Sequence, residues 1–305
     1  AMALLGDWKQ RKKYPGIKTK YVIFLTGTPI LNRPIEAFSL LNFIDNSRFS
    51  NFYHFVERYG GWMGQESRNL DELRERTKDL ILRRKLKDVV KELPDKQRTD
   101  VFVTLDTKEK KEYNKLLDEL FAKWGASQKP GLTQMQKLES FLISKKLPRV
   151  KELIDSYLDN DNPILIFSTR IDPLKELQEH YGDKAVMLDG SITNEKKRQA
   201  VIDKLISGEA KVGLFSLTAG SLGIDGLQEQ ISNVVFLNMW WTPAVHEQAE
   251  GRAYRQGQKM PVNIYYMVCT DTVDEYMREI LQEKQDIIDT VMDGELLNNV
   301  RGKSF

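Results

Sequence analysis

The stretch Val212-Gly-Leu-Phe215, followed by Ser216-Leu-Thr-Ala-Gly-Ser-Leu-Gly-Ile-Asp225, predicts a buried strand that runs into a loop of small residues, and the rest of the predicted fold is arranged around it. Val234–Leu237 predicts a second strand, and His246–Gly257, after the N-cap and first-turn pair Thr242-Pro243, predicts a helix. Short apolar strands that alternate with helices are typical of a parallel sheet covered on both faces. The loops at the carboxyl ends of such strands carry function.

The predicted helix carries two arginines on one side. With 3.6 residues per turn, Gln248, Arg252 and Arg255 share a face, while Val245 and Ala249 form a small apolar stripe that can lie close on the sheet. Two adjacent arginines on a closely packed helix are costly unless an anion meets them, which favours an anion-binding role. The alternative is a surface helix whose charges form ordinary ion pairs.

The alternation of strands and helices extends over the second half of the chain. Further strands are predicted at Ile164–Phe167, Ala185–Leu188 and Val262–Val268, with helices at 173–181, 194–207 and 243–256. The loops that follow the first two of these strands are Ser168-Thr-Arg170 and Asp189-Gly-Ser191. Before Ile164 the pattern from Pro29 onward predicts helices, preceded by one buried strand at Tyr21–Leu25.

Composition limits the classes of function. The chain has 305 residues, enough for one large domain or two ordinary ones, with 41% hydrophobic and 30% charged residues, which is typical of a globular protein. A net charge of +2 means that nucleic acid would be bound by local patches. The single cysteine, Cys269, fits a reducing, intracellular setting. Three scattered histidines give no zinc spacing, so no metal site is predicted, and no apolar run predicts a membrane span.

Three strings resemble the motifs of a known family. Ser216–Asp225 resembles the fifth helicase motif of the SWI/SNF-type DNA translocases, which are helicase-like ATPases of superfamily two. Gln248–Gln258, with the pattern Gln-Ala-Glu-x-Arg-Ala-x-Arg-x-Gly-Gln and Trp-Trp-x-Pro-Ala before it, resembles the sixth. Leu25-Thr-Gly-Thr-Pro-Ile-x-Asn-Arg-Pro34 resembles the third. The resemblance covers Tyr21 to about Asp293.

The resemblance implies a fold and an activity. It implies an α/β fold in which a RecA-like parallel sheet flanked by helices follows a helical insertion and the last strand of a truncated first lobe. The expected domains are a first-lobe remnant at 1–45, helical protrusions and linker at 46–147, a second RecA-like lobe at 148–270, and a brace helix with tail at 271–305. The expected activity is that of a DNA-dependent ATPase that moves along duplex DNA.

The resemblance also implies roles for residues. Arg252 and Arg255 would be arginine fingers at the γ-phosphate, with Gln248 as their polar partner. The ATP interface would include Gly27, Thr28, Gly223 and Asp225. Contacts to the DNA backbone are expected from Ser168, Thr169, Arg170, Gly190, Ser191, Ser216 and Thr218. The cofactors would be ATP and Mg²⁺, and the partners double-stranded DNA and an upstream RecA-like lobe of the same, monomeric protein.

Some family residues are replaced. The family usually has Asp where this chain has Gly251, His where it has Tyr254, and Asn-Leu where Asp225-Gly226 stands. Both arginines are intact, so the predicted fingers do not depend on these changes. The contacts that the replaced Asp and His would make are not expected.

The phosphate cradle of such a motor is not expected within this sequence. A P-loop needs Gly-x-x-x-x-Gly-Lys-Ser/Thr, and the one Gly-Lys-Ser, at Gly302, has Leu297 where the first glycine belongs. No Asp-Glu pair follows a predicted buried strand, so no magnesium site is expected. The chain alone is therefore predicted to be inactive, and neither to bind ATP tightly nor to hydrolyse it.

Three hypotheses remain open at this point. The chain is the carboxyl-terminal half of a duplex-DNA translocase, a stand-alone DNA- or partner-binding module without ATPase activity, or a lobe of a strand-separating helicase or restriction-type motor. The helical insertion and the Trp240-Trp241 pair favour the first hypothesis. A Walker sequence upstream in the gene would exclude the second. The expected compartment is the cytoplasm or nucleoid in a prokaryote or virus, and the nucleus in a eukaryote.

Overall fold

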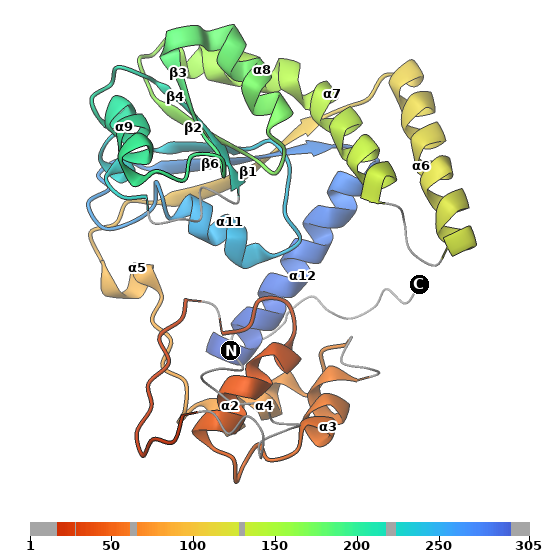
Figure 1. Ribbon diagram of the computed structural model, residues 1–305, viewed down its shortest axis with the longest axis vertical. Coiled ribbons are helices and arrows are strands. Elements are labelled where there is room, and N and C mark those ends of the chain that lie inside the picture. The colour runs from red at the N-terminus through yellow and green to blue at the C-terminus, as the bar shows by residue number, and fades with distance from the viewer. Residues whose placement is uncertain (1–16, 28, 62–65, 128–131, 218–223, 294–305) are drawn as a thin grey trace. The chain divides into compact units, whose positions relative to one another are not determined.

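The computed structural model describes residues 17–27, 29–61, 66–127, 132–217 and 224–293 (Figure 1). The chain divides into two compact units. The first comprises 1–85, 242–244 and 280–305, and the second comprises 86–241 and 245–279. Each unit is described by itself below. No helix among the described residues combines the length and the apolar character that crossing a membrane requires.

The second unit is built on one parallel sheet of six strands. Their order across the sheet is β1-β6-β5-β2-β4-β3. The strands are β1 (Lys96–Val103), β2 (Ile164–Ser168), β3 (Ala185–Leu188), β4 (Val212–Ser216), β5 (Asn233–Phe236) and β6 (Val262–Cys269). Five of them match the predicted strands to within about one residue, since strands covered on both faces are continuous apolar runs. All residues of β2, β4 and β5 are buried.

Helices cover both faces of this sheet (Figure 1). Ile164 and Ile166 of β2 share a core with α7 (Leu132–Leu158) and α8 (Asp172–Tyr181) on one face. On the other face lie α9 (Glu195–Ile206) and α11 (Pro243–Glu250). There β4 approaches α9 so closely that a Cβ on Gly213 would meet Leu165 Cδ2 at 2.4 Å and Leu205 Cδ1 at 3.1 Å. A glycine is required at this point because the layers leave no room for a side chain.

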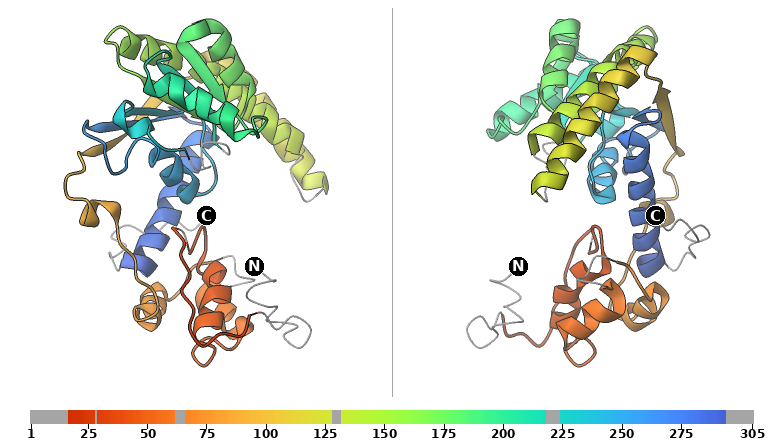
Figure 2. Two further views of the ribbon diagram at one scale, coloured as in Figure 1. Left: turned by 60° about the vertical axis from the view of Figure 1, so that its left-hand side comes forward. Right: turned by 90° about the vertical axis from the view of Figure 1, so that its right-hand side faces the viewer.

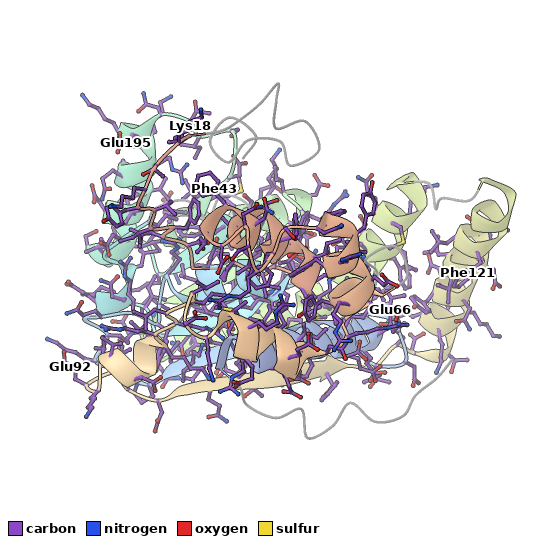
Figure 3. The ribbon with its side chains drawn as sticks, turned by 90° about the horizontal axis from the view of Figure 1, so that it is seen from below. Lys18, Phe43, Glu66, Glu92, Phe121 and Glu195 are labelled. Carbon is purple, nitrogen blue, oxygen red and sulfur yellow. The ribbon has the colours of Figure 1, made fainter. Side chains whose placement is uncertain are left out.

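A helical hairpin precedes the main part of the sheet. Its members are α6 (Thr107–Ser127) and α7, which lie side by side (Figure 2). Tyr113 and Leu120 of α6 pack with Leu138 and Leu142 of α7 in a buried cluster. Phe121 of α6 lies outside this cluster and is 55% exposed (Figure 3).

The region before Ile164 is not entirely helical, contrary to the prediction. Strand β1 occupies Lys96–Val103 and pairs in parallel with Val262–Cys269 of β6. It is an edge strand with several exposed side chains, so it lacks the apolar run that marks the buried strands. Its conformation depends on hydrogen bonds to a strand that lies more than 150 residues later in the sequence.

The first unit is a small helical body. It contains a 3₁₀ helix at Pro34–Ala37, α2 (Phe38–Ile44), α3 (Phe52–Phe55), a π-helical turn at Val56–Gly60 and α4 (Leu70–Thr77). An aromatic cluster that includes Phe38, Phe49 and Phe55 forms its core, and Ile288 and Val291 of α12 (Val273–Asp293) pack against it. The short helix α5 (Leu86–Val89) begins the second unit.

The strand predicted at Tyr21–Leu25 is not present. The segment has no regular secondary structure, and Ile23 and Leu25 are 85% and 93% exposed. A strand needs a neighbouring strand to satisfy its backbone groups. Within the described residues, the first unit holds no other strand that could be this neighbour. The apolar run of the segment therefore does not produce a strand here.

Candidate nucleotide and nucleic-acid interface

The predicted DNA-contact loops meet at one edge of the sheet. Ser168 and Ser216 are register partners at the ends of β2 and β4, and β3, which ends at Leu188, is the next strand. The loops after these three parallel strands therefore lie along the same edge. Thr218 lies outside the described residues.

The loop after β2 is held by an internal polar network. Ser168 is fully buried, and its hydroxyl donates to Asn238 Oδ1 at 3.1 Å. The Thr169 amide donates to the same oxygen at 2.9 Å, and its hydroxyl donates to Glu139 Oε1 at 2.8 Å. Asn238 Nδ2 also donates to Glu139. Thr169 and Arg170 are half-buried in this network, and Arg170 Nη2 lies 3.3 Å from Asp172 Oδ2.

Two members of this network, Asn238 and Glu139, were not predicted from the sequence. Asn238 follows the end of β5 by two residues, and Glu139 lies on α7. The one available signal was a polar residue directly after a buried strand, which marks the functional edge of a parallel sheet. Glu139 has no such mark, since only packing brings α7 to this edge.

The loop after β3 is a tight turn. Asp189 is 5% exposed, and its Oδ1 accepts hydrogen bonds from the Ser191 amide at 2.8 Å and from the Ser191 hydroxyl at 2.5 Å. The Ser191 hydroxyl is the main cause of a lowered Asp189 pKa. Gly190 and Ser191 are exposed, and an added Cβ on Gly190 would meet no atom within 4 Å. A ligand can therefore approach this backbone closely.

The helix with the predicted arginine face is shorter than expected. α11 ends at Glu250, and residues 251–256 form turns and bends. Arg252 N donates to Ala249 O and Ala253 N donates to Glu250 O, each at 3.0 Å. These tighter bonds of the 3₁₀ type interrupt the α-helical pattern, which returns once, from Tyr254 N to Glu250 O at 2.8 Å. Gln248, Arg252 and Arg255 therefore do not share the face of one regular helix, and that prediction was wrong. Gln248 is exposed in the last turn of α11.

The two arginines converge by another route. Arg252 Nη1 donates to the carbonyl of Ile224 at 2.9 Å, and Arg255 Nη1 reaches the same oxygen at 3.4 Å. Arg255 Nη1 also lies 3.0 Å from Asp225 Oδ1. The end of the 216–225 stretch and the 248–258 stretch are thus in contact, as two motifs of one site would be. Gly223 lies outside the described residues.

Arg252 and Arg255 bring two positive charges close together. Burial and then the charge of Arg255 lower the pKa of Arg252, opposed by Asp225. Asp225 is 71% exposed, so its charge is screened by water. Two guanidinium groups at one carbonyl oxygen form a place where an anion is favoured.

Two predicted residues belong to the other unit. Gly27 is exposed in a bend of the first unit, and Thr28 lies outside the described residues. Their predicted role at an ATP interface stays a prediction.

A buried carboxylate next to the arginines was also missed by sequence reasoning. Glu250 is 1% exposed and bonds to Lys96 and Arg98 of β1 and to Tyr266 of β6. The pattern of α11 could not predict this, since β1 itself was not predicted. His246, on the same helix, is 3% exposed, and its Nε2 accepts a hydrogen bond from the Trp240 amide at 3.1 Å.

Comparison with family models divides the chain in two. Residues 7–153 match the SNF2-related domain, and residues 145–257 match the helicase conserved C-terminal domain. The second match includes the sheet edge described above and ends within the 248–258 stretch.

Similar proteins cover nearly the whole chain. It is 29% identical over 291 residues to an uncharacterized ATP-dependent helicase of Mycoplasma pneumoniae, an alignment that covers 89% of this chain and 28% of that protein. It is 31% identical over 291 residues to a SWI/SNF-related matrix-associated actin-dependent regulator of chromatin, subfamily A-like protein 1, of Xenopus tropicalis, with 88% of this chain and 30% of that protein covered. The chain thus spans about a third of the length of these relatives.

A solved structure shares the fold. The SWI2/SNF2 ATPase core of Sulfolobus solfataricus in complex with double-stranded DNA has a TM-score of 0.53 at 24% identity, and the match covers 94% of this chain and 65% of that one. The RecA-like fold predicted from the sequence is therefore confirmed.

Proposed function

We propose that this chain, which belongs to the SNF2-related family of helicase-like proteins, is the carboxyl-terminal half of an ATP-dependent motor that moves along duplex DNA or remodels protein–DNA complexes. Arg252 and Arg255 are its arginine fingers, and Gln248 is their polar partner. The phosphate cradle and the magnesium ligands lie on an upstream RecA-like lobe of the same monomeric protein. The motor acts where the genome is held, which is the nucleus in a eukaryote.

The convergence of Arg252 and Arg255 on the Ile224 carbonyl carries this proposal. It joins the fifth and sixth motif stretches into one site with an excess of positive charge. A planar guanidinium with permanent charge suits the oxygens of a transferring phosphoryl group. The carboxylate that reaches the arginines, Asp225, already pairs with Arg255, and the neighbouring Glu250 is paired with Lys96 and Arg98. The described residues of this site therefore fit a phosphate better than a Mg²⁺ ion.

The loops at the ends of β2, β3 and β4 support contact with a nucleic-acid backbone. Gly190 and Ser191 offer an exposed amide and hydroxyl, and Arg170 offers a half-buried cation. Such groups bind phosphate oxygens without reading sequence. The side chains of Ser168 and Ser216 are buried, so we propose that they stabilise the conformation of these loops and do not contact the nucleic acid themselves. The similar Sulfolobus solfataricus core, which is in complex with double-stranded DNA, is consistent with this assignment.

The arginine fingers are tested in the full-length protein that contains this chain. Arg252→Ala and Arg255→Ala should each lower the turnover number of DNA-stimulated ATP hydrolysis by about 10²–10⁴-fold. The KM for ATP should change little, because the loss falls on the transition state. Arg255→Lys should recover little activity, since a point charge does not replace the planar fork.

A matched control is Arg149→Ala. Arg149 is 56% exposed and pairs with nearby Glu152 at 2.7 Å, so turnover should stay within about twofold of the wild type. Melting temperatures of all variants verify folding. Full activity of folded Arg255→Ala protein would show that the residue belongs to a structural ion pair, and the proposed function would fail.

A further inference from the structure

Glu250 is a buried carboxylate with an unusually complete set of partners. Arg98 donates to it through two nitrogens, Nε to Oε1 at 2.8 Å and Nη2 to Oε2 at 2.7 Å. Lys96 Nζ donates to Oε2 at 2.8 Å, and the Tyr266 hydroxyl donates to Oε1 at 2.9 Å. Each oxygen therefore accepts two hydrogen bonds, which fixes both the position and the orientation of the carboxylate.

The charges on these groups support each other. Burial alone would raise the pKa of Glu250, but the hydrogen bond from Arg98 and the charges of Lys96 and Arg98 outweigh it, and the pKa is lowered. Burial, and then the charge of Glu250, raise the pKa of Tyr266. Its hydroxyl therefore stays neutral and donates a hydrogen bond. The carboxylate is thus ionised and held at neutral pH, although a buried ion pair by itself is weak evidence of stabilisation.

Strand β1 contacts the arginine turn on both sides. Glu250 precedes the turn, and Lys96 Nζ also lies 5.0 Å from the centre of the Tyr254 ring, which follows Arg252 by two residues. Between Glu250 and Tyr254 the regular α-helix has ended, and the backbone is held by two bonds of the 3₁₀ type together with one from Tyr254 N to Glu250 O at 2.8 Å. Regular helical geometry alone therefore does not fix the direction of the Arg252 side chain, and β1 contacts the residue at each end of this segment.

We propose that Lys96 and Arg98 are positioning residues, which hold the turn that carries Arg252 and Arg255 by means of Glu250 and Tyr254. This inference rests on the proposed function, because it assigns the turn a phosphate-binding task that requires a fixed direction. Among the strands that the structure describes, β1 is at the edge of the sheet and pairs with β6. It directly follows residues 86–95, so a displacement of that segment would reach the arginines through these ion pairs.

The test uses the full-length protein with Lys96→Met, Arg98→Met and Arg98→Lys. Lys96→Met should lower the turnover number of ATP hydrolysis about tenfold, and Arg98→Met about 10²-fold, since small displacements of catalytic groups have effects of this order. The KM for ATP should stay within about twofold. The turnover number of Arg98→Lys should lie between those of the wild type and Arg98→Met, because lysine keeps the positive charge but lacks the planar pair of donors of the guanidinium group. Hydrogen exchange of the amides of 251–254 should become faster in each variant.

Two further variants make the outcome decisive. Lys151→Met removes a cation from an exposed ion pair with Glu176, 2.9 Å away, and should change neither turnover nor exchange. If Arg98→Met does not fold, Lys96→Met decides, because it leaves the Arg98–Glu250 pair in place. Faster exchange with unchanged turnover would mean a purely structural role, and unchanged exchange would mean no positioning; either result overturns the inference.

Arg252→Ala, measured in parallel, separates this inference from the proposed function. If Arg252→Ala loses turnover and the variants of β1 do not, only the positioning role fails. If Arg252→Ala keeps full turnover, the proposed function fails. In that case the exchange of the amides of 251–254 alone decides whether β1 holds the turn.

Discussion

Cys269 ends β6 in the core, with its Sγ 3.9 Å from the Leu142 carbonyl and no exposed surface. Burial raises the pKa of the thiol to about 12. Because the thiolate is the reactive form and an unfolded cysteine has a pKa of about 8.5, the native thiolate fraction at pH 8 should be lower on the order of 10³-fold. Alkylation by iodoacetamide at pH 8 should therefore be slower by at least about 10²-fold in native protein than in urea.

The same shift has a defined sign for stability. The folded state binds the thiol proton more tightly than the unfolded state, so this contribution is complete below about pH 8.5. It is lost as the pH rises toward the folded pKa of about 12. Rapid alkylation of Cys269 in the native protein at pH 8, under conditions where far-UV circular dichroism shows intact structure, would contradict the raised pKa of its thiol.

Lys146 on α7 connects three elements of the second unit. Its side chain is fully buried, and Nζ donates to the Leu237 carbonyl after β5 at 3.2 Å and lies 2.5 Å from Asp274 Oδ2 at the start of α12. Lys146→Met should lower the free energy of unfolding by about 3–5 kcal/mol, because it leaves the partly buried Asp274 carboxylate without its cation. Urea denaturation measures this difference.

The adjacent lysine gives a matched control for this prediction. Lys145 Nζ lies 3.2 Å from Glu109, and both side chains are about a quarter exposed. Lys145→Met should cost less than about 1 kcal/mol, as expected for an ion pair in contact with water. Equal losses for the two variants would mean that Lys146 does not connect α7 with β5 and α12 in the way described.

On the scale of the whole molecule, charge is nearly balanced, at +2 for 305 residues. The proposed DNA binding is therefore expected from local groups, the loops at one edge of the sheet, and should be weak and independent of sequence. A few neutralised phosphates give an expected slope of log affinity against log salt concentration on the order of −2 to −4. Fluorescence anisotropy with a labelled duplex at several salt concentrations measures it.

Two comparisons check this prediction. Arg170→Ala should reduce the magnitude of the slope by about 1, as expected for the loss of one phosphate contact. A scrambled duplex should compete as well as the original one at equal salt. Much weaker competition by the scrambled duplex would mean that the protein reads base edges and that contact with the backbone alone is the wrong description.

The parallel sheet could be predicted from the amino-acid sequence alone, and so could the sheet edge where the candidate site lies. The first and last residues of β2 to β6 are predicted to within about one residue. This is possible because a strand covered on both faces consists of a short run of apolar residues, such as Val212–Phe215. The loops at their carboxyl ends follow from that, since parallel strands end at a common edge. Membership of the SNF2-related family also follows from local strings, chiefly Gln248–Gln258, and the family models confirm it.

Only the tertiary structure decided which groups meet. Tyr21–Leu25 has the apolar run of a strand but no neighbouring strand among the described residues of its unit, whereas Lys96–Val103 lacks the run and becomes β1 by pairing with β6. α11 ends at Glu250, whose carboxylate is held by Lys96 and Arg98, so the arginines meet at the Ile224 carbonyl and not along a helix. The local pattern of apolar and polar residues predicts whether a side chain faces an apolar or a polar environment. It does not predict which distant residue provides that environment, because hydrogen bonds and ion pairs form between groups that come together only when the chain has folded.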